Sequence, residues 1–224
     1  MNVNLEKNPR IRHIAKKLLQ IEDKFRGRPF PSMARIKEIS NYSCGPATLE
    51  MLLSFVGYKV SQTKIIKSIR AQARIKLYGI TVDDMAKAVK AAGKKELVLW
   101  KKHKASINDI AKIIDKFSYP VGVEWQGDFY ENQDEDLGHY AVATKVNKKA
   151  GYLRMADPYF NSFFGYKDLD RKYKIADFIK EWWDTNEIKV AGRSKRKPVR
   201  DDRVIFVVTP KVDSWPKKLG MKKA

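Results

Sequence analysis

The chain has 224 residues, of which 43% are hydrophobic and 32% are charged. A chain of this length buries enough apolar surface for a stable core and needs neither disulfides nor a structural metal. No apolar stretch approaches the ~20 residues that a membrane span needs. The first residues also lack the apolar segment of a secretory signal, so we expect a cytoplasmic protein without a membrane partner.

The charge is strongly basic: 46 Lys and Arg against 26 Asp and Glu give a net charge of +20. Such a charge attracts polyanions without selecting one of them. The sequence carries no recognised nucleic-acid-binding motif, and we therefore expect only non-specific contact with nucleic acid.

Residues 11–25 predict an amphipathic helix, because their apolar residues recur at spacings of three and four and Lys and Arg lie off that stripe. We assign residues 1–35 to a basic helical extension and residues 36–224 to the main domain. The extension packs on this domain in one interpretation. In the other it recruits a partner or covers an active cleft.

Four further helices are expected in the first half of the chain. One begins at Cys44 or Gly45, where Pro46 suits a first turn, and ends at Gly57. A second follows Ser61. Residues 81–84 and 106–109 each resemble a capping box, which predicts helices that end near residues 92 and 117.

Strands dominate the second half. We expect strands at 96–100, 120–126 and 204–209, and a hairpin of 139–146 with 152–156. A helix is expected near 175–183, and loops at 127–138 and 192–203. Helices first and mostly antiparallel strands second predict an α+β fold with two lobes and a groove between them.

Three residues could together carry nucleophilic chemistry. Cys44 is the only cysteine and opens a helix, where the helix dipole favours a thiolate. His139 begins a strand after Gly138, and Asp157 ends the strand that pairs with it. The hairpin brings the histidine and the aspartate close to opposite each other, so the carboxylate can orient the imidazole toward the thiol.

The motifs around these residues resemble papain-like cysteine peptidases of the bacteriocin-processing type, the double-glycine leader peptidases and their stand-alone relatives. Cys44-Gly45-Pro46-Ala47, Gly138-His139-Tyr140 and Ala156-Asp157-Pro158 carry the resemblance, which spans about residues 36–160. It implies a papain-like fold whose helical lobe holds Cys44, the nucleophile. The sheet lobe would hold His139, the general base and then acid, and Asp157, which orients it.

One position departs from this family. Six residues before the cysteine the family usually has a glutamine that donates a hydrogen bond to the oxyanion, but this chain has Glu38. An ionised carboxylate has no proton to donate. The sequence therefore offers two oxyanion-hole candidates, Glu38 itself and the amide of Asn41.

We thus expect a cysteine peptidase that hydrolyses a peptide or protein through an acyl-thioester on Cys44, without a metal or another cofactor. Amide transfer on the same residues is related chemistry. Asp134, Glu135 and Asp136 would rim the cleft and favour basic substrates, or form a solvated loop. The alternatives are a catalytically weak or inactive module that binds peptides, and a basic nucleic-acid-associated protein.

Overall fold

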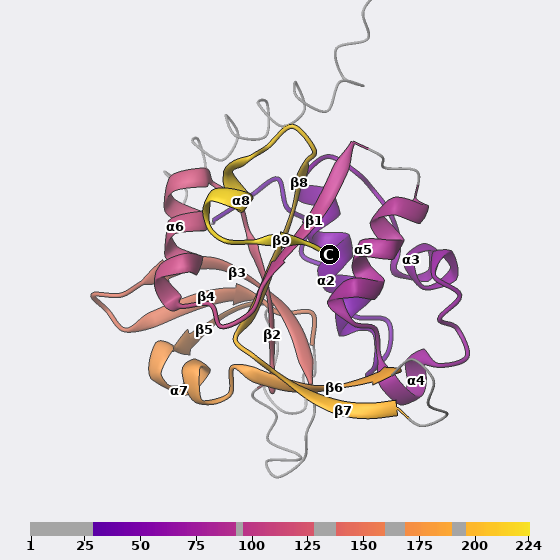
Figure 1. The fold of residues 1–224 in the computed structure, drawn as a ribbon. Helices are drawn as coiled ribbons and strands as arrows, with labels where there is room; N and C mark the ends of the chain where they lie inside the picture. The colour runs from indigo at the N-terminus through magenta and orange to yellow at the C-terminus, as the bar shows by residue number, and fades with distance from the viewer. Residues whose placement is uncertain (1–28, 93–95, 128–137, 160–168, 190–195) are drawn as a thin grey trace, which may run out of the picture.

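The computed structural model describes residues 29–92, 96–127, 138–159, 169–189 and 196–224. The amphipathic helix expected at 11–25 lies outside these residues, as do Asp134, Glu135 and Asp136. Within them, helices come first along the chain and strands follow, which confirms the α+β fold (Figure 1).

The four helices that the sequence predicts for the first half begin at the expected residues, and a further short helix, Ile75–Tyr78, is not among them. Thr81 and Ser106 each accept a hydrogen bond from the backbone three residues on, and the Asp at that position binds back, so both capping boxes are present. Ser61 caps the helix that follows it. The helices are α2 (Cys44–Phe55), α3 (Gln62–Ser68), α4 (Ile75–Tyr78), α5 (Val82–Ala91) and α6 (Ile107–Phe117).

Seven of the described strands form one antiparallel sheet. Their order across the sheet is β5-β4-β3-β2-β8-β1-β9. The central strands of this sheet come from distant parts of the sequence. The strand β8 lies between β1 and β2, although it follows both by about eighty residues or more. The strands are β1 (Leu97–Lys102), β2 (Val121–Trp125), β3 (His139–Asn147), β4 (Tyr152–Ala156), β5 (Asp170–Lys174), β8 (Val204–Pro210) and β9 (Lys222–Lys223).

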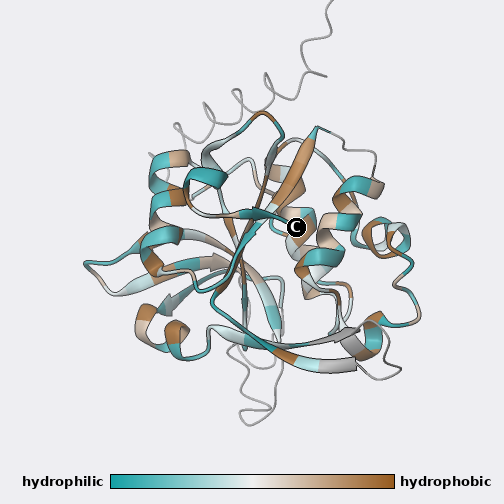
Figure 2. Ribbon diagram, in the orientation of Figure 1, coloured by the Kyte–Doolittle hydropathy of each residue, from teal (hydrophilic) through white to brown (hydrophobic). Residues whose placement is uncertain are grey.

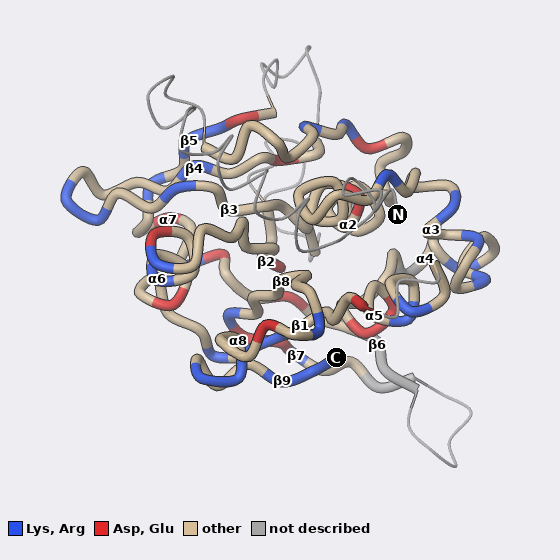
Figure 3. The backbone as a smooth tube through the Cα atoms, turned by 90° about the horizontal axis from the view of Figure 1, so that it is seen from above, with Lys and Arg blue, Asp and Glu red and all other residues tan. Residues whose placement is uncertain are grey.

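The sheet is covered on both faces, because every residue of β2 and β8 is buried. In Figures 1 and 3, α2, α3 and α5 lie to one side of the central strands and α6 to the other. Hydropathy follows this arrangement: β1 is hydrophobic at its start and hydrophilic at its end, where it leaves the core (Figure 2). The helix α2 packs against β3, and this contact brings the two lobes together.

In the second half, one prediction is confirmed with a shorter extent and one is wrong. A helix is present near 175–183 as α7 (Ile175–Lys180), and it ends before Trp182, which is buried and donates its ring N–H to the Val204 carbonyl at 3.2 Å. The loop expected at 192–203 includes β7 (Arg196–Asp202), which pairs with β6 (Trp183–Lys189) in a second, two-stranded sheet. Its polar sequence contains Pro198 and lacks alternation, so local patterns do not reveal this strand.

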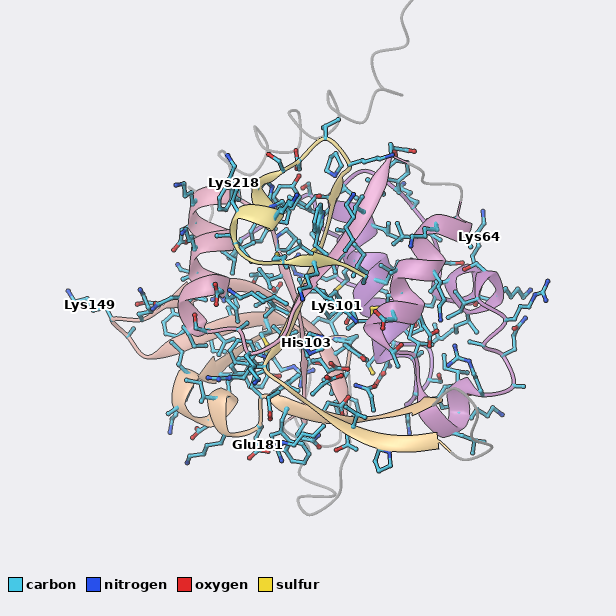
Figure 4. The ribbon with its side chains drawn as sticks, viewed as in Figure 1. Lys64, Lys101, His103, Lys149, Glu181 and Lys218 are labelled. Carbon is cyan, nitrogen blue, oxygen red and sulfur yellow. The ribbon has the colours of Figure 1, made fainter. Side chains whose placement is uncertain are left out.

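Basic residues are spread over many elements. Figure 3 shows Lys and Arg on α3, β9 and the turn between β3 and β4, with acidic positions among them. Lys64, Lys149 and Lys218 come from α3, that turn and α8 (Trp215–Lys218), at separate places on the periphery in Figure 4. No helix of the described residues is long and apolar enough to cross a membrane.

Candidate active site

Cys44 is the first residue of α2 and is half-buried. The preceding Ser43 does not cap the helix, because its hydroxyl is engaged with the backbone of Ser40, accepting from the N–H at 2.9 Å and donating to the carbonyl at 2.8 Å. Among the residues that the structure describes, none accepts a hydrogen bond from the Cys44 N–H. The thiol therefore sits at an uncapped, electropositive helix end.

Glycine follows the cysteine because α5 and the segment before it approach closely. A Cβ atom at Gly45 would lie 2.7 Å from Cγ1 of Ile80 and 3.1 Å from the Met85 side chain. The helix start is thereby packed tightly against the helical lobe, which fixes the position of the thiol.

His139 and Asp157 meet as the sequence predicts. His139 Nε2 and Asp157 Oδ1 are 2.8 Å apart, and both side chains are almost fully buried. The pairing of β3 with β4 contains a bulge between Ala143 and Lys145 and extends to Val142 opposite Ala156, so Asp157 lies one residue beyond the paired region. The His139 side chain also hydrogen-bonds with the side chain of Cys44.

Three groups hold the Asp157 carboxylate. The Tyr173 hydroxyl donates to Oδ2 at 2.7 Å, the Tyr159 N–H donates to Oδ1 at 2.9 Å, and Nη2 of Arg171 lies 3.2 Å from Oδ1. Arg171 and Tyr173 share one face of β5, two residues apart. Sequence reasoning missed both, because the polar sequence Asp-Arg-Lys-Tyr-Lys of residues 170–174 has no apolar alternation that indicates a strand.

The electrostatics of the pair favour a charged histidine. Burial alone would lower the pKa of His139, but the charge and hydrogen bond of Asp157, with a smaller contribution from Cys44, raise it to about 10. Burial would raise the pKa of Asp157, but His139, Arg171 and the Tyr173 hydroxyl lower it to about 2. An imidazolium held between a carboxylate and a thiol is the arrangement that activates a cysteine nucleophile.

The two oxyanion-hole candidates differ in their surroundings. Asn41 is exposed in the turn before α2. Glu38 is buried, and its N–H donates to the Pro158 carbonyl at 3.0 Å, next to Asp157. Burial raises the pKa of Glu38 to about 7; the charge of Asp157 adds to this, and the charges of His139, Lys37 and Arg171 oppose it.

The other histidine that the structure describes lies elsewhere. His103 follows β1, half-exposed, with Nδ1 at 3.2 Å from Asp201 Oδ1 (Figure 4). Within the described ranges, no three His, Cys, Asp or Glu residues are gathered as a metal cluster.

The comparison with known families defines the class of the protein. The profile of the Peptidase_C39 like family matches residues 25–190, and the chain belongs to that family of cysteine peptidases. Its fold is similar to the peptidase domain of Streptococcus ComA, a bi-functional ABC transporter involved in a quorum sensing pathway. The TM-score is 0.50 at 18% identity, over 79% of this chain and 97% of that one. No curated protein matches the chain.

Replacing Tyr173 with Phe should lower the free energy of unfolding by about 1.5–3 kcal/mol, because it removes a buried hydrogen bond to a charged group and leaves the packing of the ring on Trp125 in place. Denaturant unfolding at pH 6 measures this change in the free energy of unfolding. Tyr152→Phe is the matched control: that residue is on β4, its hydroxyl lies at the surface, where it hydrogen-bonds with the Asn147 side chain, and its loss should leave the free energy of unfolding nearly unchanged. Equal effects of the two variants would contradict the role given to Tyr173.

Glu38→Gln should stabilise the protein selectively at alkaline pH. The pKa of Glu38 rises from 4.5 to about 7 on folding, so between these values the folded chain binds more protons than the unfolded chain, and its stability falls as pH rises. Above pH 7 the buried carboxylate costs on the order of 3 kcal/mol, which glutamine avoids.

Unfolding of both proteins at pH 5 and pH 8.5 tests this expectation. The variant should match the wild type at pH 5 and exceed it at pH 8.5. A difference that is the same at both pH values would show that the Glu38 carboxyl is not protonated in the folded state near neutral pH.

Proposed function

We propose that this chain is a peptidase that cleaves peptide bonds through an acyl-thioester on Cys44. The observation that carries the proposal is the contact of the Cys44 thiol with His139, whose Nε2 binds Asp157 at 2.8 Å. The imidazole thus lies between the thiol and the carboxylate. This is the arrangement in which a base activates a nucleophile and is itself oriented by a third group. Family membership supports the same chemistry.

In the first half of the reaction, the thiolate attacks the substrate carbonyl carbon and forms a C–S bond, while the carbonyl electron pair moves to oxygen. The tetrahedral intermediate then collapses, the C–N bond breaks, and His139 gives its proton to the leaving amine. In the second half, His139 takes a proton from water, which attacks the thioester and releases the acid and the thiol. The uncapped Cys44 N–H at the start of α2 supplies one donor to the oxyanion.

The remaining sequence-based assignments stay part of this proposal. Residues 1–35 would form an extension and residues 36–224 the peptidase domain. A peptide or protein is the substrate and no cofactor is required. Asp134, Glu135 and Asp136 precede His139 in the chain and would favour basic substrate residues.

A random-sequence peptide library tests the function although the natural substrate is unidentified. The wild type should generate new amino termini, identified by mass spectrometry, and Cys44→Ala should generate none. Intact peptides in a preparation whose Cys44 reacts rapidly with iodoacetamide would contradict a peptidase and favour the peptide-binding module.

A further inference from the structure

The Glu38 carboxyl lies beside the reacting groups and belongs to none of their hydrogen bonds. Its backbone is fixed against Pro158, the residue after Asp157, and only 8% of the residue is exposed. The charges of His139 and Asp157 both act on its pKa, and the bond to Pro158 holds its backbone next to Asp157. Among the described residues, none donates a hydrogen bond to this carboxyl or accepts one from it.

A buried carboxyl without a donor is disfavoured as an anion, because nothing replaces the water it loses. Asp157 (after β4) adds a negative charge nearby, whereas His139 on β3, Arg171 on β5 and Lys37 on the same loop are positive. Burial is the largest of these effects and raises the pKa of Glu38 to about 7. Below neutral pH the group is therefore a carboxylic acid with an O–H to donate.

The segment that carries Glu38 is held in place from both lobes. The Ile39 N–H donates to Gln62 Oε1 at 3.1 Å, and Nε2 of Gln62 donates to the Lys37 carbonyl at 2.9 Å. Together with the bond from Glu38 to Pro158, these contacts fix residues 37–39 between α3 and the end of β4. A hydrogen-bond donor to an oxyanion must be held in a fixed position, and these contacts hold the backbone of Glu38 in that way.

We propose that neutral Glu38 donates a hydrogen bond from its carboxyl O–H to the oxyanion that forms when the Cys44 thiolate attacks a carbonyl. The assignment rests on the proposed function of Cys44. The proton stays on Glu38 throughout: the donor stabilises the tetrahedral intermediate and is unchanged when the C–S bond has formed and the leaving group has departed. A carboxylic acid kept neutral by an apolar site can serve as such a donor.

As a consequence, the rate of catalysis should be highest at acidic pH, a dependence that a glutamine at this position would not produce. As Glu38 ionises, the enzyme loses the donor and gains a negative charge beside the developing oxyanion. Loss of one donor costs on the order of 10²–10³ in rate. Catalysis should therefore fall through neutral pH while the thiol itself remains nucleophilic.

The test compares two reactions of the same thiol in the full chain. Acetylation of Cys44 by p-nitrophenyl acetate passes through an oxyanion, and alkylation by iodoacetamide displaces iodide from a saturated carbon and does not. The ratio of the two second-order rate constants, from pH 5 to 9, isolates the oxyanion donor from changes in thiolate fraction. Lysines also react with both reagents at the higher pH values, so both rates are measured by mass spectrometry on the peptide that contains Cys44, the single cysteine.

In the wild type this ratio should fall about 100-fold from a plateau near pH 5–6 to pH 9, with its midpoint near neutral pH. In Glu38→Gln it should be independent of pH. In Glu38→Ala it should be low at every pH, and the alkylation rates show that each variant retains its Cys44–His139 pair. A ratio in the wild type that does not change with pH would overturn the assignment.

Two other results are also decisive. If Asn41→Ala lowers the ratio at pH 6 and Glu38→Ala does not, Asn41 is the donor and the assignment is wrong. If Cys44 of the wild type is inert to iodoacetamide, the proposed function fails instead. A rapidly alkylated Cys44 whose ratio is insensitive to Glu38 leaves the proposed function standing and removes only this inference.

Discussion

Replacing Cys44 with serine should abolish turnover of any peptide that the wild type cleaves, with an expected loss in kcat/KM on the order of 10⁶. The effect is large because the hydroxyl of serine is far less acidic than a thiol, and the buried imidazolium that Asp157 stabilises is already protonated and cannot accept the serine proton. The other groups of the site remain, so only binding and the oxyanion donors act in the variant.

The serine variant is nearly isosteric and should fold like the wild type, which circular dichroism and denaturant unfolding verify. Mass spectrometry of the wild type with its substrate should show an acyl group on the peptide that contains Cys44, the chain's single thiol. Residual turnover above about 1% of the wild-type rate in the serine variant would mean that the thiol is not the nucleophile.

The second large effect is expected at Asp157. Asn at this position still accepts a hydrogen bond from His139 but carries no charge, so the imidazolium loses the partner that raises its pKa. The Arg171 guanidinium loses its ion pair as well. We expect kcat/KM to fall by on the order of 10²–10⁴ and the folded state to lose about 3 kcal/mol.

Kinetics on the best library peptide and denaturant unfolding measure both parts of this prediction. Asp177→Asn is a matched control, because this exposed residue of α7 makes only a 4.0 Å ion pair with Lys180. It should behave like the wild type. Comparable losses in the two variants, or an unchanged kcat/KM in Asp157→Asn, would contradict the role of Asp157 as the group that orients and stabilises His139.

The parts of the fold that depend on local chemistry were predictable. The two capping boxes start α5 and α6 at the expected residues, and the helix that Cys44 opens ends within two residues of Gly57. The hairpin of β3 and β4 was predictable from its turn and its alternation, and with it the meeting of His139 and Asp157. Short-range patterns therefore sufficed to assemble the centre of the site.

The parts that depend on tertiary contacts were not predictable. The strand β7 has a loop-like sequence, and it is β only because it pairs with β6, whose Asp184 and Asn186 bind the polar side chains Gln126 and Glu124 of the main sheet. From the sequence alone, Glu38 is likewise expected to be an ordinary ionised carboxylate. Its burial beside Asp157, which turns it into an acid that can donate, is a property of the folded chain.

The central claim is that the Cys44 thiol is paired with a charged His139, and alkylation of Cys44 by iodoacetamide from pH 4 to 10 tests it most directly. His139→Ala is compared with the wild type, and His103→Ala, which removes a half-exposed histidine paired with Asp201, is the control. Rapid alkylation of the wild type and of the control is expected already at pH 5–6. The profile of His139→Ala should move to that of an ordinary thiol, which ionises near pH ~8.5. An inert Cys44, or profiles that do not depend on His139, would contradict the account.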